Sequence, residues 1–278
     1  MNKPLGVQWL AVMGLVAVVL AAMPGAIAAG DGVHFVYEFN EGYVQQHKVG
    51  FKQQMFFGNF SRSAMVDMEV TEKCVGVTEE GLFEMELVFD KVEASIMMFD
   101  KMQDSNIGEN LTGQTISFTV DKFGETNDVR AVGYIDAWSQ MEQLVTEIAN
   151  QFYVYLPDED HAEGENWERT DERDENGMNI TESWEYKFEK VDEVRGRKCA
   201  KVKAEVEFGI GGIAVTPSGD FNMEGEGDGD YEFFFDWAEK LVVKMKGSIE
   251  VKSDMTPVSG TGDEIESNII YEIERELL

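Results

Sequence analysis

Apolar side chains recur at every second position in several segments of the chain. The apolar members of the clearest runs are Val33, Phe35, Tyr37 and Phe39; Ala64, Val66, Met68 and Val70; Phe83, Met85, Leu87 and Phe89; Trp184, Tyr186 and Phe188; and Val202, Ala204, Val206 and Phe208. A period of two is typical of a strand with one buried face. Because the intervening positions are mostly polar or charged, the pattern predicts an antiparallel sheet with one solvent-exposed face.

The end of the chain is also predicted to be a strand, over residues 263–277. Ile265, Ile269, Tyr271 and Ile273 occupy odd positions there. The same residues also fit a helix with a step of four, so the helical alternative stays open for this segment.

One segment has a helical pattern. Between residues 136 and 155 the apolar residues are spaced by three and four, which places them on one stripe of a helix. They are Trp138, Met141, Val145, Ile148 and Phe152. The sequence therefore predicts a mostly β fold, a curved antiparallel sheet or half-barrel, with one central amphipathic helix at about 136–155.

Turn residues recur at similar spacing in the two halves of the chain. Gly81 lies forty residues before Asp121, and Gly196 lies forty residues before Asp236. This spacing predicts two related β units, each too small to close a core alone. We expect them to form one joint globular domain, the first unit over 29–156 with the helix and the second over 157–278.

The first 28 residues have the pattern of a secretory signal peptide. Lys3 is followed by an apolar run from Leu10 to Ala22, then by Pro24 and the small-residue pattern Ala26-Ile27-Ala28. The apolar run is short for a membrane span, which needs about 20 residues. We therefore expect cleavage near Ala28, export to the periplasm or the exterior, and no stable membrane insertion after cleavage.

The chain is strongly acidic. It has 54 Asp and Glu residues against 23 Lys and Arg, a net charge of −31, and removal of the predicted leader takes away only Lys3, which leaves −32. Nucleic acids and anionic membranes bind proteins through cations that neutralise phosphate, so the charge argues against both as partners.

Cysteine and histidine are scarce. Cys74 and Cys199 are the only cysteines, and the histidines are His34, His47 and His161. Export permits a disulfide between the two cysteines but does not require one. The set does not match a zinc site, and no metal is expected. The histidines are interpreted as surface or strand residues.

No catalytic constellation stands out. Acidic pairs are abundant, and with so many acids any chosen pair is better explained as a solvated face than as an acid and base. The run from Glu224 to Asp230 places four acids at alternate positions, which suits Ca²⁺ or an acid-lined strand. Because it lacks the spacing of an EF-hand loop, we favour the strand. We predict a protein that is not an enzyme and needs no cofactor.

Several residues at the junction of the two halves resemble a known group. Leu156-Pro157, then Gly164 and Trp167, together with Asp121 and Gly133, are similar to a family of uncharacterised exported bacterial proteins with two repeats. The resemblance implies a half-barrel like that of the LolA and LppX lipoprotein-carrier group. This chain has no cysteine near the predicted cleavage site, so the lipid anchor of lipidated relatives is not expected.

Methionine and phenylalanine are concentrated in the first half of the chain. Methionine is flexible and polarizable, and it suits apolar sites that accept varied ligands. We expect a cleft between sheet and helix for a lipid or another apolar ligand, with the ordinary core as the competing interpretation. The candidate residues are Met55, Phe57, Met85, Met97, Phe99, Trp138, Met141 and Phe234. The alternative function is a structural or protein-interaction module, with an unknown protein partner and no small ligand.

Overall fold

The computed structural model describes most of the chain beyond the predicted leader. The described residues are 32–58, 60–99, 101–103, 106–133, 145–146, 148–149, 152–154, 156–157, 160–175, 177–216, 219–260 and 264–278. The predicted signal peptide, residues 1–28, lies outside them. Among the described residues, no helix is both long and apolar enough to cross a membrane.

The described structure is mostly β. Its elements in chain order are β1 Val33–His34, β2 Val44–Phe57, β3 Phe60–Val77, β4 Phe83–Met98, β5 Lys101–Gln103, α1 Ile107–Leu111, β6 Thr115–Val120, β7 Thr126–Ala131, β8 Asp160–His161, β9 Asn166–Glu175, β10 Met178–Val194, β11 Arg197–Thr216, β12 Gly219–Asp236, β13 Leu241–Pro257 and β14 Ile265–Leu277. The predicted C-terminal strand is confirmed as β14.

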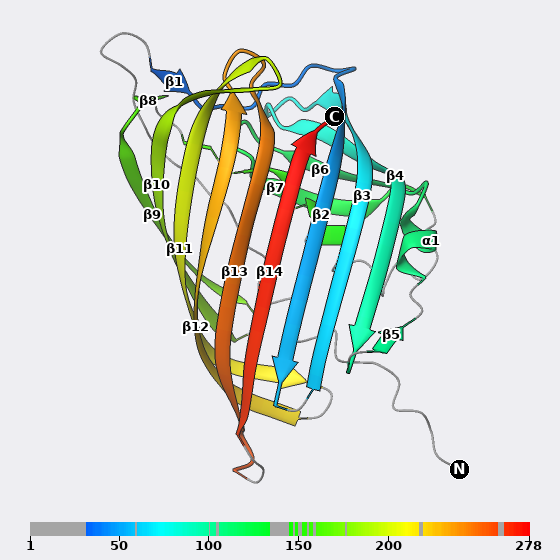
Figure 1. Cartoon of the computed structure of the whole chain (residues 1–278), viewed down its shortest axis with the longest axis vertical. Coiled ribbons are helices and arrows are strands. Elements are labelled where there is room, and N and C mark those ends of the chain that lie inside the picture. Colours follow the sequence, from blue (N-terminus) through cyan, green and yellow to red (C-terminus); the bar gives the residue numbers. More distant parts are fainter. Residues whose placement is uncertain are drawn as a thin grey trace.

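One sheet of twelve strands forms the body of the molecule (Figure 1). Its order is β7-β6-β4-β3-β2-β14-β13-β12-β11-β10-β9, and β5 pairs with β4. Every pairing is antiparallel, as the alternation predicted, and the sheet curves without closing on itself. The half-barrel is therefore confirmed. The two halves of the chain meet where β14 pairs with β2.

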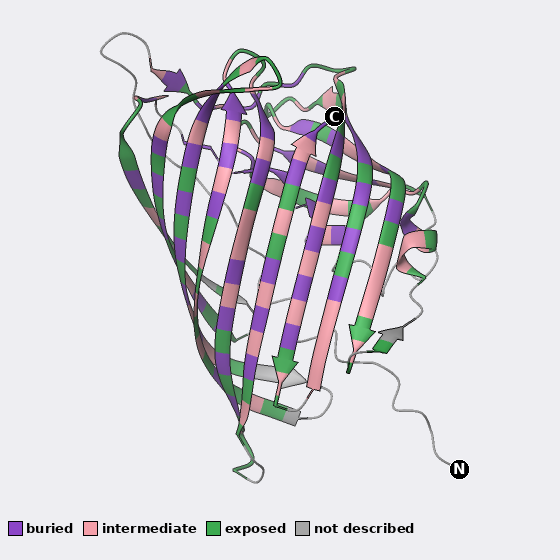
Figure 2. Cartoon of the chain, in the orientation of Figure 1, coloured by how far each residue is buried: buried purple, intermediate pink, exposed green. Residues whose placement is uncertain are grey.

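The alternation along each strand sorts side chains between the two faces of the sheet (Figure 2). In β10 the buried residues Trp184, Tyr186 and Phe188 alternate with exposed charged residues, and the predicted inward runs of β3, β4 and β11 are buried as well. In β12 the glycines between Glu224 and Asp230 face β13 closely; a Cβ at Gly227 would lie 2.5 Å from the carbonyl oxygen of Glu250. Glycine thus permits a close strand approach there.

The concave side of the sheet is filled by two segments that are not part of it. Phe35, Tyr37 and Phe39 are buried, although their run was predicted as a strand and only Val33–His34 pairs, with β8. Tyr37 OH donates to the carbonyl oxygen of Val154 at 2.9 Å and accepts from the Val154 amide at 3.1 Å. The two segments are therefore held against each other inside the sheet.

Most of the predicted helix 136–155, including Trp138 and Met141, lies outside the described residues. Within it, Val145, Ile148 and Phe152 are helical and buried, as the apolar stripe predicted for them. The short helix α1 was not predicted. It is adjacent to β4, where the hydroxyl of Thr112 accepts a hydrogen bond from the Val92 amide at 3.1 Å.

The two halves share local hydrogen-bond patterns. Gly42 N donates to Cys74 O and Cys74 N to Tyr43 O; likewise Gly164 N donates to Phe188 O and Phe188 N to Glu165 O. In both β3 and β10 a register shift follows directly after that residue. These parallels agree with the predicted pair of related β units, whose common origin stays a prediction.

Asp121 and Asp236, paired in the sequence by their spacing, have the same role. The Oδ1 atom of Asp121 accepts hydrogen bonds from the amides of Phe123 and Glu125, and Asp236 Oδ1 accepts from those of Ala238 and Glu239. Each aspartate therefore caps the turn that follows a strand.

The two cysteines are both free and buried, so the possible disulfide is not formed. Cys74 lies on β3 in the main core, and Cys199 lies on β11 in a small separate cluster with Leu241, Val243 and Leu277. The two strands are not neighbours in the sheet, and a disulfide needs Cα atoms within about 7 Å.

Candidate functional site

The described members of the predicted apolar cleft do not lie together. Met55 and Met85 are buried in the core at 3% and 0% exposure, and Phe57 packs against that core. Met97 and Phe99 are exposed at the surface. Phe234 packs with the separate cluster around Cys199. Trp138 and Met141 are outside the described residues, so a cleft that includes them stays a prediction.

A small interior cavity lies between the sheet and the helical residues. Its volume is about 10 Å³, and its lining includes Phe51, Phe152, Ile273 and Arg275. A cavity needs about 10–15 Å³ to hold one water molecule. It is therefore too small for a lipid chain.

Four exposed apolar residues of the first half gather at one end of β2, β3 and β4, on the outer face, whereas Val44, Val75 and Val77 are exposed at the other end of β2 and β3. Phe56, Met65, Met97 and Phe99 have exposed fractions of 43%, 46%, 42% and 56%. Ser63 lies between them, opposite both Gln54 of β2 and Met97 of β4. Residues two apart on one strand share a face, so Met65 and Met97 are diagonal neighbours, with Cα atoms about 7–8 Å apart.

We call this surface the acid-free face. It consists of Gln54, Phe56, Ser61, Ser63, Met65, Ser95 and Met97, with Phe99 at one end and Lys52, which is opposite Met65 and paired with Glu272, at its border. No Asp or Glu occurs from Phe51 to Val66 or from Ala94 to Phe99, in a chain that has 54 acids among 278 residues. A partner can cover such a face without burying an unpaired carboxylate, which would be costly.

Phe99 is held in an unusual conformation. Its φ is +50°, in the left-handed region that a bulky side chain rarely adopts. Its amide donates to the Ser61 carbonyl at 3.2 Å, and its ring meets that of Phe60 edge-on at 5.1 Å. These contacts hold the exposed ring at the end of the acid-free face.

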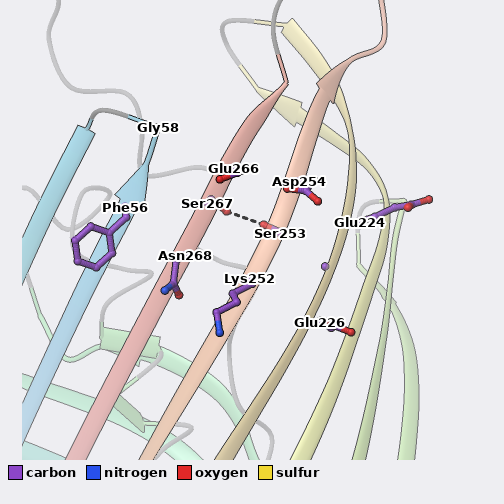
Figure 3. Close-up of a pocket in the computed structure, with 11 residues that line it drawn as sticks. Phe56, Gly58, Glu224, Glu226, Lys252, Ser253, Asp254, Glu266, Ser267 and Asn268 are labelled. Atoms are coloured by element: carbon purple, nitrogen blue, oxygen red, sulfur yellow. Dashed lines mark hydrogen bonds between the residues drawn. The ribbon is translucent and has the colours of Figure 1, made fainter.

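A polar hollow adjoins the acid-free face and shares Phe56 with it (Figure 3). We call it the acidic groove. Its volume is about 680 Å³, and it is lined by Phe56, Gly58, Glu224, Gly225, Glu226, Lys252, Ser253, Asp254, Glu266, Ser267 and Asn268. Figure 3 shows Phe56 at one side and Glu224 and Glu226 at the other.

The charge of the acidic groove is strongly negative. Glu224, Glu226, Asp254 and Glu266 supply carboxylates, and Lys252 is the only basic residue in its lining. The Lys252 ammonium lies 3.1 Å from Glu250, just outside the groove, so it is already paired. Among the described residues, no three or more His, Cys, Asp or Glu side chains are placed to hold a metal ion.

A polar cluster inside the half-barrel was missed by sequence reasoning. The Glu72 carboxylate accepts hydrogen bonds from Tyr153 and, at 3.4 Å, from Tyr43, and His47 Nε2 lies 2.9 Å from it. His47 and Glu72 are each 2% exposed, and His47 is a strand residue of β2, one of the two positions predicted for the histidines. The Arg275 guanidinium of β14 lies 4.6 Å from the Phe152 ring centre.

Burial and hydrogen bonding set the charges of this cluster. Burial raises the pKa of Glu72, but hydrogen bonds from His47 and Tyr153 and the charge of Arg275 outweigh it, so the pKa lies below its usual value. Burial lowers the pKa of His47, and Glu72 opposes this only in part. Moreover, His47 Nδ1 has no hydrogen-bond partner among the described residues. We therefore assign an ionised Glu72 and a neutral His47 that donates from Nε2.

The cluster holds together three strands and the segment around Tyr153. His47, Glu72, Tyr153 and Arg275 are buried and Tyr43 is half-buried, so the contacts of the cluster stabilise the fold. A signal for it exists in the sequence: His47 lies two residues before Val49, and Glu72 lies two residues after Val70, which places both at inward positions.

The other two histidines differ in burial. His34 is exposed, as expected from its outward position, and its Nδ1 atom contacts Asp160 of β8. His161 is 3% exposed, and its ring stacks on Trp167 with centres 3.6 Å apart. His161 is thus a strand residue of β8 rather than a surface residue, because the aromatic core extends to it.

Comparisons with known proteins yield no family. No family model and no curated protein matches the chain. Among solved structures, the chain is weakly similar to DynF from the dynemicin biosynthesis pathway of Micromonospora chersina, with 8% identity, 98% of this chain and 92% of that chain covered, and a TM-score of 0.24.

A porin variant of Rh. blastica has 9% identity, with 85% of this chain and 100% of that chain covered, and a TM-score of 0.18. Both likenesses are too weak to carry an argument, and the resemblance to the lipoprotein-carrier group stays a prediction.

Proposed function

We propose that the mature protein is an exported, non-catalytic interaction module that docks a partner protein through the acid-free face. The observation that supports this most is the exposure of Phe56, Met65, Met97 and Phe99 on one acid-free end of a strongly acidic molecule. Contiguous exposed apolar surface on a soluble protein is typical of interaction sites.

The composition of the face fits a protein interface. Interface centres are enriched in aromatic residues and methionine and depleted in charged residues. Two phenylalanines and two methionines, separated by Gln54 and short serines, match this composition. The interior cavity between the sheet and the helical residues agrees with the same proposal, because its volume of about 10 Å³ is too small for a lipid chain.

Site-specific photo-crosslinking in the cells that produce the protein tests this proposal. Met97 is replaced by the photoreactive residue p-benzoylphenylalanine, and the matched control carries the same residue at Val191, which has a similar exposure of 41%. We expect a discrete cross-linked species from position 97 that position 191 does not yield. The species should disappear when Phe56→Ser and Met65→Ser are introduced together.

Equal cross-linking from both positions would contradict the proposal. So would a species at position 97 that persists in the Phe56→Ser, Met65→Ser background. Neither substitution is expected to disturb folding, since both side chains are exposed and surface changes usually alter stability by no more than about 0.5 kcal/mol.

A further inference from the structure

The acid-free face and the acidic groove form one continuous surface, which is apolar at one end and negatively charged at the other. Phe56 belongs to both. From there the acid-free face extends across β3 to Met97 of β4, and the groove extends across β14 and β13 to Glu224 and Glu226 of β12. A partner that covers Phe56 therefore meets apolar side chains on one side and carboxylates on the other.

We infer that the partner is a basic amphipathic peptide segment, with apolar residues at one end for the acid-free face and lysine or arginine at the other for the acidic groove. This inference rests on the proposed function and specifies the partner of the same surface. Complementary charges across an interface fix orientation and speed association, and they disfavour partners of like charge.

The dimensions of the surface set the length of the segment. The surface spans six adjacent strands, from β4 to β12, which are separated by five intervals. At about 4.8 Å between neighbouring strands the distance is about 24 Å. An extended chain covers about 3.3 Å per residue, so seven or eight residues reach from Met97 to Glu226.

The local charges favour a cation in the groove. Lys252 is paired with Glu250 at 3.1 Å, and Asn268 donates to the same Glu250 oxygen at 2.8 Å. Glu224, Glu226, Asp254 and Glu266 are exposed, and no salt bridge among the described residues includes them. A lysine or arginine of the partner would supply counter-charge to carboxylates that stand close together.

A fluorescence anisotropy titration tests the inference with a labelled peptide of four leucines followed by four lysines. The comparison peptide has four leucines followed by four glutamates. With the full-length mature protein at low ionic strength we expect saturable binding of the lysine peptide alone. Binding should weaken at least about fivefold in 0.5 M NaCl, because salt screens exposed charges.

Two double variants distinguish binding that depends on the acidic groove from binding that depends only on the net negative charge of the protein. Glu224→Gln with Glu226→Gln should weaken binding of the lysine peptide about fivefold, since each exposed ion pair contributes up to about 1 kcal/mol. The matched control is Glu185→Gln with Glu205→Gln, an exposed pair of acids on β10 and β11 that removes the same charge elsewhere. The control should bind like the unaltered protein.

A third variant distinguishes failure of this inference from failure of the proposed function. Met65→Ser with Met97→Ser should also weaken the lysine peptide about fivefold, because the leucines lose their contact area. If only this variant weakens binding, or if the glutamate peptide binds equally well, the basic partner is wrong while the docking face stands.

If neither Glu224→Gln with Glu226→Gln nor Met65→Ser with Met97→Ser changes binding of the lysine peptide, both proposals are overturned. Vesicles of phosphatidylcholine test a lipid surface as the alternative ligand. Binding to them that depends on Met65 and Met97, with no binding of the lysine peptide, would replace the peptide partner with a lipid surface and would overturn this inference.

Discussion

Two regions of the same sheet use their outer faces in opposite ways. On β10, β11 and β12 the outward positions carry acids such as Glu205, Glu207 and Asp228, and Lys201 bridges Glu189 and Glu232 across the strands. On the far ends of β2, β3 and β4 the outward positions carry Phe56, Met65 and Met97 and no acid. Alternation determines which residues point outward, but it does not determine whether those outward residues are charged or apolar.

The inner faces of the two regions also differ. In the second region the rings of Trp167, Tyr186 and Trp184 stack in sequence with centres 5.7 Å apart. In the first region a buried polar cluster forms around the Glu72 carboxylate, which neutral His47 contacts at 2.9 Å. The Glu72 carboxylate therefore lies inside the sheet between Val70 and Cys74, the apolar residues two positions away on the same face, and its hydrogen-bond partners make this possible.

The largest expected effect comes from removing a carboxylate on the inside rather than the outside. Glu72→Ala leaves His47 and Tyr153 without their common hydrogen-bond partner and removes the negative charge near buried Arg275, and each buried polar group left unsatisfied costs about 1–3 kcal/mol of unfolding free energy. The matched control Glu205→Ala, on the outer face of β11, should change stability by no more than about 0.5 kcal/mol. Urea denaturation monitored by tryptophan fluorescence measures both, and equal losses would contradict the assigned inner cluster.

A smaller effect is expected from pH. The pKa of His47 is lower in the folded protein than its ordinary 6.5, so the unfolded chain binds more protons between those two values. Stability is then fully present above about pH 6.5 and is lost as the pH falls toward the folded pKa, by up to about 1.4 kcal/mol per pH unit. The pKa of Glu72 is also lowered, which adds a further loss below its ordinary 4.5.

Unfolding free energies between pH 7.5 and pH 5 check this sign. His47→Gln, which retains a donor for Glu72, should flatten the curve in this range, whereas His34→Gln on the exposed β1 should leave the slope unchanged. A stability that rises as the pH falls from 6.5 would mean that the folded pKa of His47 is raised, and the neutral assignment would be wrong.

The smallest effect on stability, together with a strong effect on docking, is expected when glutamates are introduced into the acid-free face. Met65→Glu with Met97→Glu should alter the unfolding free energy by no more than about 0.5 kcal/mol, because both side chains are exposed. Because position 97 then carries glutamate, the photoreactive residue is placed at the exposed Phe99, and the cross-linked species obtained there with Met65 and Met97 intact should be lost. A matched pair of glutamates at Val191 and Ile213, which are exposed elsewhere, should retain it.

Much of the fold could be predicted because a period of two is a local signal. The inward residues of β3, β4, β10 and β11 were identified from the alternation, and so was the C-terminal strand β14. The run from Phe35 to Phe39 has the same alternation and is buried, yet it lies outside the main sheet. A period of two indicates that one side of a segment is buried, but it does not indicate which strand, if any, the segment pairs with.

The sites were less predictable for the same reason. Met55 of β2 and Met97 of β4 looked alike as apolar residues of strands, but one lies in the core and the other on the surface, because successive positions of a strand point to opposite faces. His47 and Glu72 are 25 residues apart, and only the pairing of β2 with β3 brings them together.

The amino-acid sequence by itself determined that this protein forms strands with one apolar face, where many of those strands lie, and that its surface is strongly acidic, since these properties depend on neighbouring residues and on composition. The tertiary structure decided that β14 pairs with β2, that Glu72 is shared by His47 and Tyr153, and that Phe56 joins an acid-free face to an acidic groove. These features depend on contacts between residues far apart in the chain, which local patterns do not encode.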